Sequence, residues 1–176
     1  MTVDMTIRAL KVLLPALLVA ACSRAPASSA NQTPPSGGYK PSPLVAWLEC
    51  VECTEEQLTA VADLRDAAVP ELKSVLLTGP PRARLDGQRD HLQKRYQTLK
   101  DYERLNPDQR VPFTQEDYVR LYLAKYVLLN RMRSARALGA IGTPAAKDAL
   151  NQARQLPDLP DDLRREIDAA LVARPR

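Results

Sequence analysis

The sequence predicts an all-α protein, and three observations favour this fold class. The 176 residues include 26 Leu and 24 Ala, two strong helix formers, against only 12 Val and 3 Ile. Aromatic residues, which favour strands as β-branched residues do, make up only 5% of the chain. Helix-capping residues recur from position 44 onward, and helical spacing of apolar residues follows them. An all-β fold and a parallel α/β sheet are therefore not expected.

The composition also limits the chemistry that we expect. The chain is 45% hydrophobic and 26% charged, which is typical of a folded protein. One His and three Cys leave little material for a metal site or a nucleophilic catalytic site. The sequence lacks a phosphate-binding loop, a zinc-protease motif, a nucleophile elbow and a dinucleotide-binding fingerprint. We therefore expect a protein that is not an enzyme and that uses no cofactor and no metal.

Residues 1–21 have the pattern of a secretory signal peptide. Arg8 and Lys11 precede an apolar run from Val12 to Ala20, which is too short to span a bilayer. The next residues, Val19-Ala20-Ala21-Cys22, resemble a bacterial lipobox, and the resemblance implies that Cys22 is lipidated and anchors the chain in a membrane. The alternative is an ordinary signal peptide that is cleaved near this point, with Cys22 incidental.

The residues after Cys22 carry the expected location and the expected linker. Ser23 follows the cysteine, as in lipoproteins that are sorted to the outer membrane, and this likeness implies a periplasm-facing protein of a bacterial envelope. Residues 22–43 are dominated by Ser, Pro, Ala and Gly, a composition typical of a flexible linker that buries no core. Residues 44–176 are then expected to form the helical domain.

The expected helices of the first half follow from their caps and stops. Thr54 and Gln57 form a capping box, which predicts a helix over about 55–66. Pro70 fits the first turn of a second helix over 70–77, and Gly79 with the two following prolines ends it. A polar helix is predicted within 82–105, where Leu recurs every seven residues at 85, 92 and 99. So narrow an apolar stripe leaves most of this helix facing water.

The second half contains the longest predicted helix. Thr114 caps it, and its apolar residues cover a broad arc as far as about Leu138, so it is expected to be the packed spine of the domain. Gly139 and Gly142 are expected to end this helix. Thr143 and Pro144 open the next helix, to about 155, and a last helix is predicted over 160–173.

Two stretches of the chain look alike. Residues 64–76 and 138–150 share Leu, Pro, Lys and Leu at an offset of 74 residues. The stretch from Ala137 to Leu150 resembles the HEAT and HEAT-like repeat family, in its Leu-Gly turn, its Pro-Ala-Ala helix start and its closing Leu. The first stretch is a degraded copy, with Arg65 where the family has Gly. The resemblance implies a short HEAT-like stack of antiparallel helix pairs that presents a surface to protein partners.

Cys50 and Cys53 are the two cysteines outside the lipobox. A secreted protein permits a disulfide between them, which would pin the chain ahead of the Thr54 cap. Two unpaired buried thiols and a redox-active C-x-x-C pair are the alternatives. The redox reading lacks the preceding strand that a thioredoxin-like motif would have.

Tyr118, Tyr122 and Tyr126 are spaced to share one face of the longest helix, either as packing against a neighbouring helix or as a ligand-contacting strip.

Charge is uneven along the domain. Residues 44–81 carry two basic and seven acidic groups, whereas residues 82–136 carry thirteen basic and seven acidic groups. The two segments either neutralise one another or leave a basic face for an anionic partner. The candidate residues of that face are Arg95, Lys125, Arg131, Arg133 and Arg136.

These observations predict an envelope lipoprotein with a HEAT-like module for protein–protein interaction or assembly. The runner-up is a binder of an anionic envelope polymer through the basic face of residues 82–136. A thiol-redox protein that uses Cys50 and Cys53 is a third possibility. Nucleic acid is not an expected partner in the predicted compartment.

Overall fold

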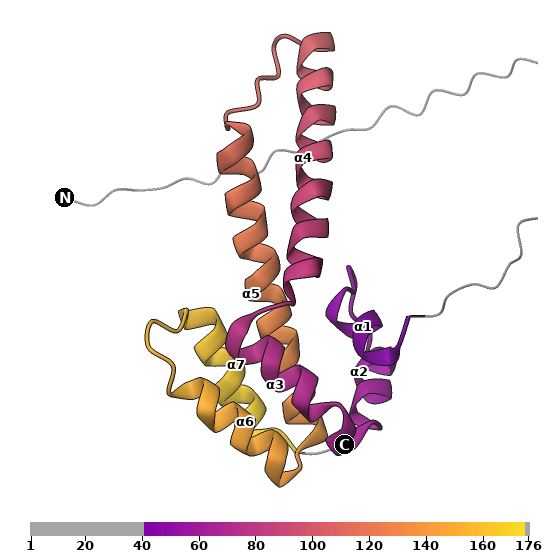
Figure 1. The fold of residues 1–176 in the computed structure, drawn as a ribbon, viewed down its shortest axis with the longest axis vertical. Coiled ribbons are helices and arrows are strands. Elements are labelled where there is room, and N and C mark those ends of the chain that lie inside the picture. Colours follow the sequence, from indigo (N-terminus) through magenta and orange to yellow (C-terminus); the bar gives the residue numbers. More distant parts are fainter. Residues whose placement is uncertain (1–40, 175–176) are drawn as a thin grey trace, which may run out of the picture. The chain divides into compact units, whose positions relative to one another are not determined.

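The computed structural model describes residues 41–174, and all regular structure in this range is helical (Figure 1). The signal peptide, Cys22 and all of the linker up to residue 40 lie outside the described residues, so these stay predictions. The elements are α1 (Pro43–Leu48), α2 (Glu55–Ala62), the 3-10 turn η1 (Arg65–Ala67), α3 (Val69–Thr78), α4 (Arg82–Leu105), α5 (Gln115–Ile141), α6 (Pro144–Arg154) and α7 (Asp161–Val172).

The predicted caps are confirmed by their hydrogen bonds. The Gln57 amide donates to Thr54 Oγ1 at 3.3 Å, and the Thr54 amide donates to Gln57 Oε1 at 3.0 Å, which completes the capping box. Thr114 accepts from the Asp117 amide at 3.1 Å and Thr143 accepts from the Ala146 amide at 3.3 Å. These side chains satisfy amides that have no partner within the first turn of their helices.

The structure differs from the predicted boundaries at three places. The first predicted helix stops at Ala62, because Arg65 adopts a left-handed φ of 49° and a separate 3-10 turn follows. The longest helix continues past Gly139 and ends at Ile141, with Gly142 in the left-handed conformation at its C-cap. Helix α1 was not predicted, because six residues are too few to show a helical period.

Helix α5 is the spine of the domain, as the sequence predicts. It contacts each of the other described α-helices. Its C-terminal part packs with α2, α3, α6 and α7, while α3 and α6 also contact one another. We call this part, formed by α1–α3, α6, α7 and the C-terminal part of α5, the base. Its core is large and continuous, and includes Trp47, Leu72, Leu138, Leu150 and Ile167.

The internal repeat is visible in the base. Helices α3 and α6 start with a proline in the first turn and bury equivalent positions, Leu76 matching Leu150. The turns that precede them are joined by the Thr143 hydroxyl, which donates to Asp66 Oδ1 at 2.6 Å. The first unit is the degraded one: Leu138 is fully buried, whereas Leu64, its counterpart, is exposed. The arrangement is a short HEAT-like stack of helices.

Between the two repeat units the chain makes a long excursion. Helix α4 and the N-terminal part of α5 run side by side as a helical hairpin that leaves the base (Figure 1). We call this pair the hairpin. It accounts for the offset of 74 residues between the two copies, where HEAT units run to about 40–47 residues. The hairpin has its own small core of Leu92, Tyr96 and Tyr118.

Candidate interaction surface

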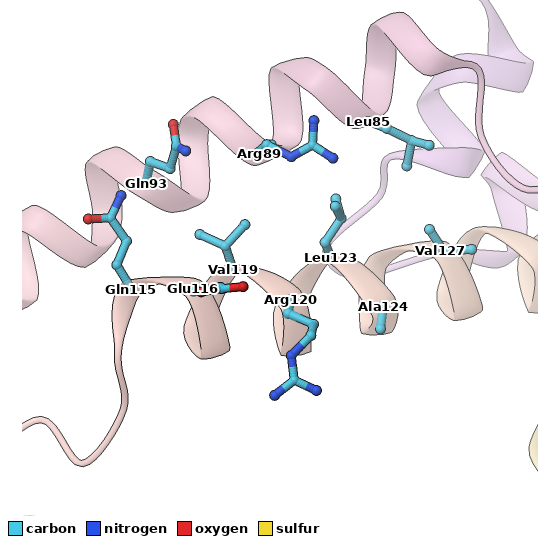
Figure 2. A pocket seen from close by; sticks show the side chains of 10 residues that line it. All are labelled: Leu85, Arg89, Gln93, Gln115, Glu116, Val119, Arg120, Leu123, Ala124 and Val127. Atoms are coloured by element: carbon cyan, nitrogen blue, oxygen red, sulfur yellow. The ribbon is translucent and has the colours of Figure 1, made fainter.

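An apolar groove runs along one side of the hairpin, between α4 and α5 (Figure 2). Its volume is about 690 Å³. Helix α4 contributes Leu85, Arg89 and Gln93, which lie at successive turns of that helix. Helix α5 contributes the lining residues Gln115, Glu116, Val119, Arg120, Leu123, Ala124 and Val127.

The groove exists because the seam between the two helices is incompletely filled. Leucines at 85, 92 and 99 follow a seven-residue repeat, and a packed seam needs a second apolar residue within each repeat. In the repeat that starts at Leu92, Tyr96 fills this position and is buried. In the repeat that starts at Leu85, the matching residue is Arg89, whose side chain is 48% exposed. Leu123 on α5 is therefore left only partly covered.

Polar groups surround the apolar floor. Arg89 donates to Asp86 Oδ1 at 2.9 Å, and Arg120 donates to Asp117 Oδ1 at 2.6 Å, so each arginine pairs within its own helix. The hydrogen bond from Arg120, with a second one from the Thr114 hydroxyl, lowers the pKa of Asp117. The side-chain amide of Gln97 donates to Gln115 Oε1 at 3.0 Å and ties α4 to the start of α5.

The tyrosines lie on another face of α5 and take different roles. Tyr118 is buried against Tyr96, with ring centroids 5.6 Å apart, and against Tyr122 at 4.5 Å. Tyr118 therefore packs against the neighbouring helix, as the first reading of the tyrosine spacing expects. Tyr126 instead donates its hydroxyl to Glu49 Oε1 at 2.6 Å, at the C-terminal cap of α1. Burial, followed by this hydrogen bond, raises the pKa of Tyr126.

Two of the five residues predicted for the basic face donate hydrogen bonds to backbone carbonyls at the ends of helices in the base. Arg133 donates to the carbonyl oxygens of Leu48 at 2.7 Å and Cys50 at 2.6 Å, and its own carbonyl accepts from the Trp47 indole at 2.9 Å. Arg131 donates to the carbonyl of Leu76 at 2.8 Å. In a continuing helix that carbonyl would accept from residue 80, but residue 80 is a proline and has no amide hydrogen.

Arg131 and Arg133 are thus half-buried, and burial lowers the pKa of both guanidinium groups. The sequence pattern gave no sign of this structural role, because it depends on contacts with α1 and α3. Arg136 is exposed, 3.9 Å from Glu166. Arg95 and Lys125 are exposed and have no hydrogen bond or ion pair within the described range. Partner binding by any of these five residues stays a prediction.

The acidic and basic segments meet where the hairpin joins the base. Arg84 at the start of α4 lies 3.8 Å from Glu49 and 3.4 Å from Glu71, both of which belong to the acidic segment. With the Tyr126–Glu49 hydrogen bond, these contacts fix the hairpin to α1 and α3. This junction is one contact of the kind that the first reading of the uneven charge expects.

Cys50 and Cys53 form a disulfide, with their Cα atoms 5.2 Å apart. Cys50 is buried, while Cys53 is exposed and borders a smaller cavity of about 230 Å³ together with Trp47 and Met132. The bridge closes the turn between α1 and the Thr54 cap of α2. A local bridge is therefore present, whereas a redox role for it stays a prediction.

Residues 131–155 match the family model of the PBS lyase HEAT-like repeat. The match covers the C-terminal part of α5 and helix α6. Comparisons with curated proteins and with solved structures found no significant match. Among residues 41–174, no helix is both long enough and apolar enough to cross a membrane. The chain carries a HEAT-like repeat, with its repeat helices packed in the base.

Proposed function

We propose that the protein is a bacterial envelope lipoprotein whose HEAT-like domain binds or assembles another envelope protein. The observation that carries this proposal is the groove of the hairpin, an apolar surface that the described chain leaves open. HEAT-like repeats present surfaces to protein partners, and here the surface is enlarged by an inserted element. The lipobox-like residues 19–22 and the linker support a lipid anchor that holds this domain at the outer membrane, facing the periplasm.

The lining of the groove suits binding better than catalysis. It consists of aliphatic, amide and guanidinium groups, with Glu116 as its one carboxylate. General acid–base chemistry needs a titratable group whose pKa is matched to the reaction, usually with a second group that positions it. We therefore propose a binding protein without enzymatic activity.

The anionic-polymer alternative has weaker support. Of the five candidate basic residues, Arg131 and Arg133 already donate their hydrogen bonds to backbone carbonyls of the base. Arg95, Lys125 and Arg136 remain as exposed charges, and single surface cations give only weak, salt-sensitive attraction. Capture of purified cell wall by the protein that falls as salt rises would favour this alternative.

Two measurements in cells test the proposal. Cys22→Ser should move the protein from the membrane fraction to the soluble or unprocessed fraction, and unchanged partitioning into detergent would refute the lipid anchor. A photo-crosslinking amino acid at Ala124, in the exposed lining of the groove, should give a discrete crosslink to another envelope protein. The same group at Arg164, exposed on α7 in the base, is the control. Equal crosslinking at both positions would contradict a specific surface.

A further inference from the structure

We infer that the groove of the hairpin binds an amphipathic helix of about three turns, with acidic residues beside its apolar stripe, from a separate protein. This inference rests on the proposed function and names the element through which the partner docks. Three features carry it: the length of the groove, the small core of the hairpin and the charges at the middle of the groove.

The groove has the length and the shape for a helix. On α5 its lining runs from Gln115 to Val127, which corresponds to about 18 Å at 1.5 Å per residue, or about three turns. Val119, Leu123 and Val127 lie four residues apart and form one apolar ridge along α5. A helix with apolar residues three and four apart packs against such a ridge. A third helix laid here would complete a three-helix bundle.

The hairpin also has more to gain from a third helix than the base has. Its buried core consists of Leu92, Tyr96 and Tyr118, while Leu123 and Val119 are only partly covered. Apolar surface that is removed from water contributes about 25 cal/mol per Å². A partner that covers the ridge would therefore gain binding energy from side chains that the protein itself leaves partly in water.

The charges define the flanks of the partner helix. Arg89 lies on the α4 side of the groove and Arg120 on the α5 side, where its side chain points away from α4; both lie near the middle of the length of the groove (Figure 2). Each pairs with an aspartate of its own helix, and the side chains of both pairs are about half exposed or more. Exposed pairs of this kind contribute little, so the arginines are free to turn to carboxylates of a partner. Acidic residues beside the apolar stripe would meet both walls.

The same charges argue against occupants from this chain. A second copy, packed antiparallel about the centre of the groove, would bring its own Arg89 and Arg120 close to the first pair, and like charges disfavour that arrangement. Residues 22–40 carry Arg24 and Lys40 but no Asp or Glu, so the linker lacks the complementary charge. A separate protein with an acidic amphipathic helix therefore suits the groove best.

The test uses two synthetic helical peptides of about four turns, identical in their leucine stripe, with either Glu or Lys at the flanking positions. Their binding to the purified full-length protein is measured by fluorescence anisotropy. We expect the Glu peptide to bind at least about tenfold more tightly than the Lys peptide. The double variant Arg89→Glu with Arg120→Glu should reverse this preference, because both walls then carry the opposite charge.

A second pair of variants locates the binding. Leu123→Asp places a charge on the apolar ridge and should weaken binding of the Glu peptide by more than about tenfold. Leu121→Asp is the matched control, because Leu121 lies on the same helix, is 54% exposed and does not line the groove. The control should bind within about twofold of the wild type. Circular dichroism verifies that the variants stay helical, and the charge-reversal pair remains decisive if Leu123→Asp unfolds.

Several outcomes would overturn the inference. They are failure of both peptides to bind, equal binding of the two, an unchanged preference in the double arginine variant, and equal effects of the two leucine variants. Sedimentation that shows a dimer which Leu123→Asp breaks would instead assign the groove to a second copy. Groove-dependent binding to phosphatidylethanolamine–phosphatidylglycerol vesicles would assign it to a lipid surface. A crosslink at Ala124 in cells without peptide binding would leave the proposed function standing and refute the acidic helix alone.

Discussion

The base and the hairpin share one long helix, α5, but the two parts of that helix are packed differently. In the C-terminal part of α5, small residues such as Ala135, Ala137 and Gly139 are buried, and neighbouring helices approach closely. In the N-terminal part, Tyr118 is the one residue of α5 in the buried core of the hairpin. One helix therefore has two roles. Small residues in the C-terminal part of α5 allow close packing in the base, whereas the larger residues of its N-terminal part pack against α4 alone and leave a surface open.

Truncating a leucine should separate the two regions most strongly. Leu150 is fully buried in the base, so Leu150→Ala leaves a cavity and should cost about 3 kcal/mol of the free energy of unfolding. Leu123 already borders the open groove, so Leu123→Ala removes partly solvated atoms and should cost less than about 1 kcal/mol. Urea unfolding of both variants measures the difference. Similar losses would mean that the hairpin is packed as tightly as the base.

Adding a methyl group should act with opposite sign in the two regions. A Cβ at Gly139 would lie 2.8 Å from Cα and Cβ of Ala170, so Gly139→Ala must push α5 and α7 apart and should cost about 1–3 kcal/mol. A Cβ at Gly87 in α4 would meet nothing within 4 Å, and alanine is the better helix former, so Gly87→Ala should stabilise by about 0.5–1 kcal/mol. Thermal melts of the two variants should move in opposite directions; the same direction for both would contradict the close helix contact.

The two kinds of basic residue should also respond differently. Arg133→Met removes the donors to the carbonyls of Leu48 and Cys50 and should cost about 1–2 kcal/mol. Arg95→Met on the exposed side of α4 should change the free energy of unfolding by less than about 0.5 kcal/mol. Chemical denaturation gives both values. If Arg133→Met leaves the free energy of unfolding unchanged, water replaces Arg133 at the two carbonyls, and Arg133 is a surface charge without a structural role.

The helices of the fold could be predicted from the sequence more completely than the candidate interaction surface. The caps at Thr54, Thr114 and Thr143 and the repeat around Pro144 are local patterns, and their helices begin where expected. Gly139 was expected to end a helix, but it lies within α5, because its lack of a side chain serves the contact with α7. That reason depends on a partner 31 residues away in the chain, which no local pattern contains.

The groove and the junction could be predicted less well. The signal for the groove was present, since Arg89 interrupts the seven-residue repeat of α4, but a polar residue at that position is equally typical of a helix that faces water. The junction joins residues from the end of α1, from α4 and from α5, namely Glu49, Arg84 and Tyr126. These residues come together only in the folded structure, so the sequence alone does not reveal the contact. Long-range polar contacts of this kind have no sequence period.

The smallest expected effect concerns Tyr126, which lies where the two regions of α5 meet and donates to Glu49. Burial and that hydrogen bond raise its pKa in the folded state above the ordinary value of about 10. The folded protein therefore retains this proton when the unfolded chain has lost it, so the contribution is fully present below about pH 10 and is lost as the pH rises further. Tyr126→Phe should cost about 1 kcal/mol or less near neutral pH and should make the loss of stability above about pH 10 shallower than in the wild type.

Tyr102→Phe, at an exposed tyrosine of α4, is the control and should keep the wild-type pH dependence. Urea unfolding from about pH 8 to about pH 11 measures all three proteins. If Tyr126→Phe and the wild type lose stability in parallel, the hydroxyl is not held at the junction, and the hairpin would be fixed to the base by Arg84 and its two carboxylates instead.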